Sequence, residues 1–508
     1  MIEAVRNTGA NYRLNGRRTE SRVTAVICFL AFLLLGGLAV LRPFLVLGFF
    51  ALVAAVGLCL FAIVLARRAG LELWQVLLLT ALTGYAVLNY GFENLAIHLG
   101  GFPLIISYGL MYASMAFAVF SCRHTISRTL KEPAMTCIFA FLFLTVLHLV
   151  VDIPRYGLWA VRDASMFLDG IFLLLGLLWS MKHSSVMLLL KWLMVVFLLN
   201  LGYSFLMPWE DALSSWSPKS GVFVMTPIVG NYRGNQVFLL LGALFFILLA
   251  RYVVRWPRWI LLLLAAAQLF GLAILQARAE YVGILVSLIV FLFLGEIGKF
   301  SKLLSLLAPP LIVILILTTV GIEISGRIGP VNLAFFKEHI LSIGGVEGTP
   351  GSSVEGRAGW IDQAMQHFWP NPVFGEGFGL PLIDFRDARS GNMVRQPHNS
   401  SVSVLARLGV VGFAVWVIFN LRVLIQFIRG FRQRSSWNSL LSNLLLWLFL
   451  VYLIEMINIS TEAGLEFPSS DIPFLFFVGL ALGLVSSQVQ QRNRLELRTP
   501  LSHVGNRV

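Results

Sequence analysis

The chain has 508 residues, of which 58% are hydrophobic and only 12% are charged, and its formal net charge is +13. Soluble globular chains are about 45–50% apolar and about 25% charged, so this composition excludes an ordinary soluble enzyme, a disordered protein and a small disulfide scaffold. It predicts an all-α polytopic membrane protein, because chains cross a bilayer as apolar helices or as closed barrels.

Fourteen apolar segments come close to the roughly 17–25 residues that a transmembrane helix needs. We expect 12–14 transmembrane helices. In chain order the segments are 23–41, 44–66, 73–90, 102–121, 134–151, 165–181, 186–207, 236–254, 259–276, 281–300, 303–320, 403–427, 440–457 and 472–487. The last one contains Gly479 and Gly483, a small-xxx-small pattern that favours close helix packing.

The positive charge follows the topology. With the N-terminus in the cytoplasm, most of the 38 Lys and Arg residues fall in the cytoplasmic connections and tails, as the positive-inside rule requires. The charge therefore favours contact with anionic membrane lipids, and it gives no support for nucleic acid binding. The predicted organisation is a basic cytoplasmic tail (1–22), spans 1–11 (23–320), a large loop on the outer side of the membrane (321–402), spans 12–14 (403–487) and a cytoplasmic tail (488–508).

The large loop is the distinctive part of the chain, since a connection of that length is usually functional or disordered. Residues 356–369 predict an amphipathic helix with Trp360, Ala364 and Phe368 on one face, ended by Pro370. The segment 371–379 (NPVFGEGFG) then contains three turn-forming glycines. We expect short helices that lie on the outer membrane surface; composition alone leaves open whether they form a lid without chemistry.

His398 stands at the end of this loop, directly before Asn399 and Ser400. Either of the two is a good N-cap for the following helix, whose N-terminus favours an anion such as a phosphate. A single histidine is more often a polar interface residue than a catalyst, so both interpretations stand.

Arg278 lies in the short outer turn 276–280. It could form a surface pair with Glu280, or it could bind a diphosphate through two parallel hydrogen bonds. Arg357, at the start of the predicted loop helix, lies on the same side of the membrane.

These motifs resemble those of the bacterial O-antigen ligase and O-antigen/exopolysaccharide polymerase superfamily. His398 and Asn399, nine residues, Gly409, two residues and Gly412 are similar to the family signature. The segments 357–360 (RAGW) and 371–377 (NPVFGEG) resemble its Arg…Trp…Asn-Pro…Gly-x-Gly run. The segment 230–235 (GNYRGN), which precedes a span, looks like a degenerate form of the family's Gly…Asn-x-x-Asn motif. The resemblance covers roughly 220–430; the N-terminal half matches only as generic spans.

The resemblance implies a GT-C-like, inverting and metal-independent glycosyltransferase without a cofactor, in the bacterial inner membrane with its active site facing the periplasm. The implied donor is an oligosaccharide on a polyprenyl diphosphate, and the acceptor is a lipid A core (ligase) or another glycan (polymerase). Other polysaccharide-assembly proteins are implied partners. The rival class is a flippase for lipid-linked oligosaccharides, although the chain has no evident repeat of the kind common in transporters.

The resemblance also implies roles for individual residues. Arg278 and Arg357 would neutralise the leaving diphosphate, and His398 would act as general base or as a further phosphate contact. Three further candidates for substrate contact are Trp360, whose ring could stack on a sugar, and Glu280 and Asn399. The sequence departs from the family pattern at Ala277, where Ser or Thr is usual, and Glu280 could weaken anion binding or itself be the base.

Overall fold

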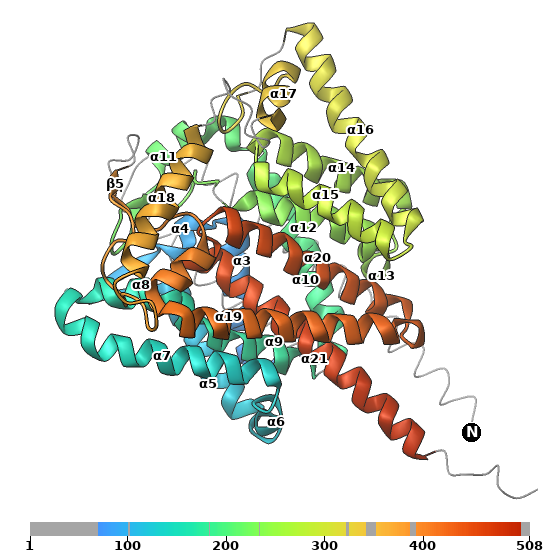
Figure 1. The fold of residues 1–508 in the computed structure, drawn as a ribbon. Helices are drawn as coiled ribbons and strands as arrows, with labels where there is room; N and C mark the ends of the chain where they lie inside the picture. The colour runs from blue at the N-terminus through green and yellow to red at the C-terminus, as the bar shows by residue number, and fades with distance from the viewer. Residues whose placement is uncertain are drawn as a thin grey trace, which may run out of the picture.

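The computed structural model describes residues 70–99, 102–181, 183–232, 234–321, 325–341, 352–386 and 393–498 (Figure 1). The predicted tail 1–22 and the predicted spans 23–41 and 44–66 lie outside these residues. The described elements are α3 (Leu73–Val87), α4 (Tyr90–Glu93), β1 (Ala96–Leu99), β2 (Phe102–Ile105), α5 (Ile106–Ser121), α6 (Arg123–Thr129), α7 (Pro133–Tyr156), α8 (Leu158–Leu168), η1 (Asp169–Phe172), α9 (Leu173–Ser180), α10 (His183–Ser204), η2 (Met207–Trp209), α11 (Glu210–Trp216), β3 (Lys219–Ser220), β4 (Thr226–Pro227), α12 (Asn235–Leu248), α13 (Ala250–Val253), α14 (Arg258–Leu275), α15 (Arg278–Phe293), α16 (Ile297–Val320), α17 (Leu333–Leu341), α18 (Ser352–Phe368), β5 (Phe385–Arg386), β6 (Met393–Val394), α19 (Ser400–Gln433), η4 (Arg434–Ser436), α20 (Ser439–Thr461), η5 (Gly464–Glu466) and α21 (Pro468–Arg498).

The predicted all-α polytopic class is confirmed. Seven described helices are long and apolar enough to cross a membrane, namely α7, α10, α14, α16, α19, α20 and α21. Three shorter apolar helices, α3, α5 and α12, also coincide with predicted spans. The total number of spans and their orientation stay predictions.

Two predicted spans differ from the structure. The segment 165–181 is not one helix, because the 3-10 turn η1 separates α8 from α9 where Asp169 accepts a hydrogen bond from the Tyr108 hydroxyl (3.0 Å). The segment 281–300 is divided as well, since α15 ends at Phe293 and Gly295 turns the chain with φ +69° before α16 begins. Left-handed backbone of this kind ends a helix, and glycine adopts it at little cost.

Helix α21 occupies the centre of the bundle, and α7 and α16 lie at its periphery. In the most apolar stretch of α21, 78% of the residues are buried, against 33% in α7 and 22% in α16. The exposed apolar side chains of α7 include Phe143 and Val150, which we expect to face lipid. Helix α21 also extends to Arg498, past the predicted end of the last span at residue 487.

Close backbone contact between α9 and α21 confirms the small-residue pattern. A Cβ atom on Gly479 would lie 2.1 Å from the Leu173 carbonyl oxygen, and one on Gly176 would lie 2.0 Å from that of Phe476. Only glycine leaves room for two helices at this separation. The two helices therefore pack backbone to backbone at the centre of the bundle.

In the part of the chain that the structure describes, three antiparallel two-stranded ribbons connect helices. Strands β1 and β2 pair with Ala96 opposite Ile105, so the first four residues of the predicted span 102–121 form a strand before α5 begins. Strand β3 pairs with β4, and β5 pairs with β6 within the large loop. The loop helix α18 packs against α19, and α17 contacts α16, which it follows in the chain (Figure 1).

Candidate functional site

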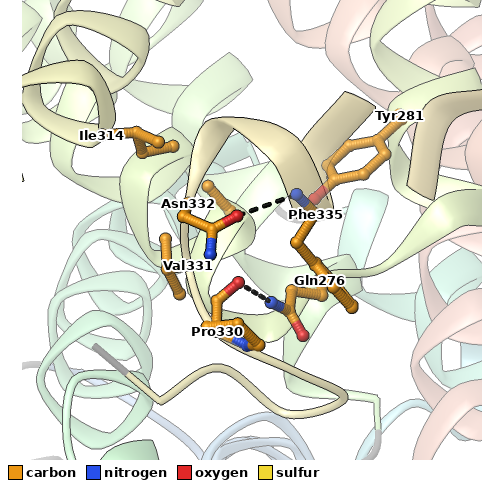
Figure 2. A pocket seen from close by; sticks show the side chains of 8 residues that line it. Gln276, Tyr281, Ile314, Pro330, Val331, Asn332 and Phe335 are labelled. Carbon is orange, nitrogen blue, oxygen red and sulfur yellow. Dashed lines mark hydrogen bonds between the residues drawn. The ribbon is translucent and has the colours of Figure 1, made fainter. Parts of the chain in front are cut away.

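The outer turn between α14 and α15 fixes the first part of the large loop. Gln276 has φ +52°, and its side-chain oxygen accepts from the backbone N–H groups of Ile328 (2.7 Å) and Gly329 (2.9 Å). Its amide nitrogen donates to the Gly329 carbonyl (2.8 Å), and Asn332 accepts from the backbone N–H of Phe335 (2.8 Å). Figure 2 shows these side chains around a small open pocket, which none of the six candidate site residues lines. The pocket therefore belongs to the contacts by which Gln276 holds residues 328–330 of the loop, which we call the loop anchor.

This anchor carries a third arginine, Arg327, to the candidate site. Its backbone N–H donates to the Ile274 carbonyl (3.2 Å) and its Nε to the Leu275 carbonyl (3.0 Å). Arg278 begins α15 two residues after Gln276, and burial together with the positive charges of Arg357 and Arg327 lowers its pKa. Arg278 therefore lies within electrostatic range of two other guanidinium groups, those of Arg357 and Arg327.

Helix α18 supplies two of the predicted residues. The predicted helix 356–369 is confirmed, although it begins four residues earlier, at Ser352, and ends at Phe368 before Pro370. Arg357 and Trp360 are three residues apart and therefore lie on one face of the helix. Arg357 Nη2 donates to Glu462 Oε1 (2.6 Å), and the Trp360 ring packs against the His398 ring with centroids 5.2 Å apart.

His398 and Asn399 form the entry to α19. Asn399 is the N-cap, since its side chain accepts from the backbone N–H of Val402 (3.1 Å). His398 has φ +51°, a left-handed conformation that few non-glycine residues adopt and that is concentrated at functional sites. Its Nδ1 lies 3.1 Å from Glu462 Oε2. The structure thus gives Asn399 a capping role and turns the His398 ring toward Glu462.

Glu462 joins two of the three predicted catalytic residues, with Arg357 on one carboxylate oxygen and His398 on the other. Burial alone would raise the pKa of its carboxyl group, but the hydrogen bond with His398 and the charge of Arg357 hold that pKa below its ordinary value. The Glu462 side chain is 44% exposed, so solvent screens part of this interaction. Arg357 is 34% exposed and His398 is 21% exposed, which leaves both reachable from outside.

Glu280 is not part of a surface pair. Glu280 is buried, with 1% of its surface exposed, and its Oε2 atom has no hydrogen-bond partner among the described residues. It lies within electrostatic range of Glu462, Glu455 and Arg327. Glu280 therefore places a buried carboxyl group within electrostatic range of Arg327 and Glu462.

A break in α19 explains the glycine motif. Gly409 has φ +63° inside the helix, and the segment 371–377 packs across the break. The backbone N–H groups of Glu376 and Gly377 donate to the carbonyls of Ala406 (2.9 Å) and Arg407 (3.0 Å). In the other direction, the N–H of Val410 donates to the Pro372 carbonyl (2.8 Å). The backbone groups that the break frees are thus satisfied by the loop, as buried backbone requires.

A buried ion-pair network holds this loop against the bundle. Asp163 Oδ2 lies 3.0 Å from Arg395 Nη2 and 3.1 Å from Arg407 Nη2, and the side chains of Asp163 and Arg407 are fully buried. Arg407 Nη1 also donates to the Gly377 carbonyl (3.1 Å), and Arg395 Nη2 donates to that of Gly379 (2.7 Å). The network links α8, the loop and α19.

Three of the six predicted site residues, Arg357, Trp360 and His398, therefore meet in one place. Arg278 lies within electrostatic range of Arg357 and Glu462. Asn399 caps the helix that follows His398, and Glu280 is buried within electrostatic range of Glu462. Sequence reasoning missed Arg327 and the bridging position of Glu462. No local pattern marks either residue, because each reaches the site through tertiary structure.

Residues 260–417 match the family model described as O-antigen ligase. The matched segment contains Arg278, Arg357, Trp360, His398 and the Gly409 break, and it ends before Glu462. A comparison with curated proteins returned no match.

Proposed function

We propose that this chain, whose residues 260–417 match the O-antigen ligase family model, transfers an oligosaccharide from a polyprenyl-diphosphate carrier to a hydroxyl of a glycan or lipid A-core acceptor. The observation that carries the proposal is that Arg357 and His398 contact one carboxylate, that of Glu462, with Arg278 within electrostatic range of Arg357 and Glu462. Arg278 begins α15, Arg357 lies on α18 and His398 precedes α19.

The arginines provide the charge that the leaving group needs. As the glycosidic bond to the carrier breaks, negative charge accumulates on the diphosphate, and positive groups fixed in advance at that position stabilise the transition state. Guanidinium groups bind phosphate oxygens through parallel hydrogen bonds and stay protonated in proteins. Arg278 and Arg357, with Arg327 nearby, would take the role that a divalent cation takes in other glycosyltransferases.

His398 provides the base. Its ring would accept the proton of the acceptor hydroxyl while the hydroxyl oxygen bonds to the anomeric carbon. The bond from that carbon to the diphosphate oxygen breaks at the same time, and its electron pair leaves with the carrier. A single displacement of this kind inverts the anomeric configuration.

The predicted orientation places this reaction at the periplasmic face of the inner membrane. The starts of α15 and α19 follow outer connections in the positive-inside assignment, and α18 lies in the large outer loop. Trp360, stacked on His398, would present an aromatic edge beside the sugar that is transferred.

Transfer by purified protein in vesicles tests the proposal. With a synthetic polyprenyl-diphosphate oligosaccharide and an acceptor glycan, we expect the wild type to release polyprenyl diphosphate and to form a longer glycan. Arg278→Ala and His398→Ala should each lower the rate by at least about 100-fold, the range of a lost charge contact or general base. Glu338→Gln, on the exposed surface of α17, is the matched control and should keep the wild-type rate.

Normal transfer by either alanine variant would contradict the mechanism. Movement of the intact lipid-linked oligosaccharide across the vesicle membrane, without transfer, would instead favour the flippase class. The acceptor that is extended distinguishes ligase from polymerase.

A further inference from the structure

Glu462 contacts both His398 and Arg357, and no role follows for it from the proposed chemistry alone. Its carboxylate is divided between them, with Oε1 2.6 Å from Arg357 Nη2 and Oε2 3.1 Å from His398 Nδ1. Glu462 lies at the C-terminal cap of α20, outside the segment that matches the family model.

The contact determines which nitrogen of His398 carries the proton. An ionised carboxylate only accepts hydrogen bonds, and the lowered pKa of Glu462 keeps it ionised near neutral pH. Nδ1 must therefore donate, so in the neutral ring the lone pair is on Nε2. Only a nitrogen with a free lone pair can accept a proton from an acceptor hydroxyl.

The surroundings of the ring hold this arrangement. Trp360 covers one face of the imidazole, with the ring planes tilted by 32°, and the left-handed backbone of His398 is fixed by the Asn399 cap that follows. The C-terminal end of α20 adds partial negative charge next to Glu462. The charged group in contact with the ring is Glu462 from the end of α20; Arg357 from α18 is paired with that carboxylate, and Arg278 from α15 lies within electrostatic range of both.

We propose that Glu462 is the positioning residue of the glycosyl transfer: it holds His398 with the proton on Nδ1 and stabilises the imidazolium formed when Nε2 takes the acceptor proton. This inference rests on the proposed function. The proton moves from the acceptor hydroxyl to Nε2, the hydroxyl oxygen bonds to the anomeric carbon, and the diphosphate leaves with the electron pair of the broken bond. The carboxylate itself is not protonated, as in the carboxylate–histidine pairs of hydrolases.

A different role for Glu462 would be that of a counter-ion, which occupies Arg357 until the diphosphate replaces it. The two roles predict opposite kinetics. A counter-ion competes with the donor, so its removal lowers the donor KM and leaves kcat unchanged. A positioning residue acts in the chemical step, so its removal lowers kcat and leaves the donor KM nearly unchanged.

The experiment measures kcat and donor KM for Glu462→Gln, Glu462→Asp and His398→Ala, and for Glu462→Gln combined with His398→Ala. We expect Glu462→Gln to lower kcat by about 100-fold or more, in line with the loss of a carboxylate that orients a catalytic histidine. Glu462→Asp keeps the charge and should recover part of that loss. Asp362→Asn, on the exposed surface of α18, is the control and should keep both constants.

The double variant separates positioning from general damage. If Glu462 acts through His398, Glu462→Gln should cause no further loss once His398 is alanine, because residues of one catalytic unit are not additive. A full multiplicative loss would overturn the inference, as would a wild-type kcat with a lowered donor KM in Glu462→Gln. Wild-type activity of His398→Ala alone would refute the proposed function itself, so the two failures are distinguishable.

Discussion

The indole of Trp360 packs on the imidazole of His398, with ring centroids 5.2 Å apart and the planes tilted by 32°. Trp360 also contacts Phe385 of β5, at 5.2 Å between centroids, so the loop ribbon supports the tryptophan from its other side. The orientation of the candidate base thus depends on a helix and a ribbon that both belong to the large loop.

Replacing Trp360 by alanine should lower kcat for transfer by about 10-fold, since an aromatic pair contributes about 0.5–1.5 kcal/mol beyond the area that it buries. Initial rates at saturating donor provide the measurement. Trp369→Ala is the matched control, because Trp369 is 67% exposed at the end of the same helix. Equal losses in the two variants would show that Trp360 acts only on the stability of α18.

A lysine in place of Arg357 should not support full transfer activity. A lysine keeps the charge but not the planar pair of donors, so Arg357→Lys should lower kcat/KM for the donor by at least about 10-fold. The comparison is with Arg386→Lys on β5, which is exposed and should be neutral. Full activity of Arg357→Lys would leave the residue with a structural role in its pair with Glu462.

The break in α19 should not tolerate a side chain. A Cβ at Gly409 would lie 2.3 Å from the Val373 carbonyl oxygen, and the left-handed conformation itself costs a non-glycine residue about 1–2 kcal/mol. We expect Gly409→Ala to lower the unfolding temperature in detergent and to reduce transfer, since the loop and His398 both depend on this contact. In Gly359→Ala the added Cβ meets nothing within 4 Å on α18, so that variant should unfold at the wild-type temperature or above.

Neutralising Asp163 should lower the free energy of unfolding more than neutralising any other acidic residue described above. Asp163→Asn leaves Arg395 and Arg407 buried without their counter-charge, and breaking a buried pair costs about 3–5 kcal/mol. Denaturation monitored by tryptophan fluorescence should show this loss. Lys299→Ala removes a partly exposed partner of Glu296 and should cost under about 1 kcal/mol, so a similar change in both variants would refute the special role of the network.

Much of this site could be predicted from sequence, for local reasons. The amphipathic spacing predicted α18, the polar pair before a span predicted the Asn399 cap, and the family motif pointed to His398. The rest depends on tertiary structure. Glu462 comes 64 residues after His398, beyond two long helices. Gly409 belongs to the sequence motif, but the helix break at this residue becomes evident only from the loop that packs across it. Arg327 reaches the site only because Gln276 folds the loop back.

The orientation of the large loop can be tested with a single cysteine. In a chain whose four native cysteines are replaced by serine, Trp369→Cys should react with a membrane-impermeant thiol reagent added from the periplasmic side. Ser435→Cys lies at an exposed position between α19 and α20 and should react only when the membrane is permeabilised, so that the reagent reaches the cytoplasmic side. The reverse pattern would contradict the orientation and the periplasmic site together.

The configuration of the product at the anomeric carbon tests the central claim most directly. Purified protein would be incubated with a polyprenyl-diphosphate oligosaccharide of known configuration, and the new linkage would be assigned from the anomeric proton coupling constant by NMR. Single displacement with His398 as base predicts an inverted linkage and one polyprenyl diphosphate released per bond formed. A retained configuration would contradict the account.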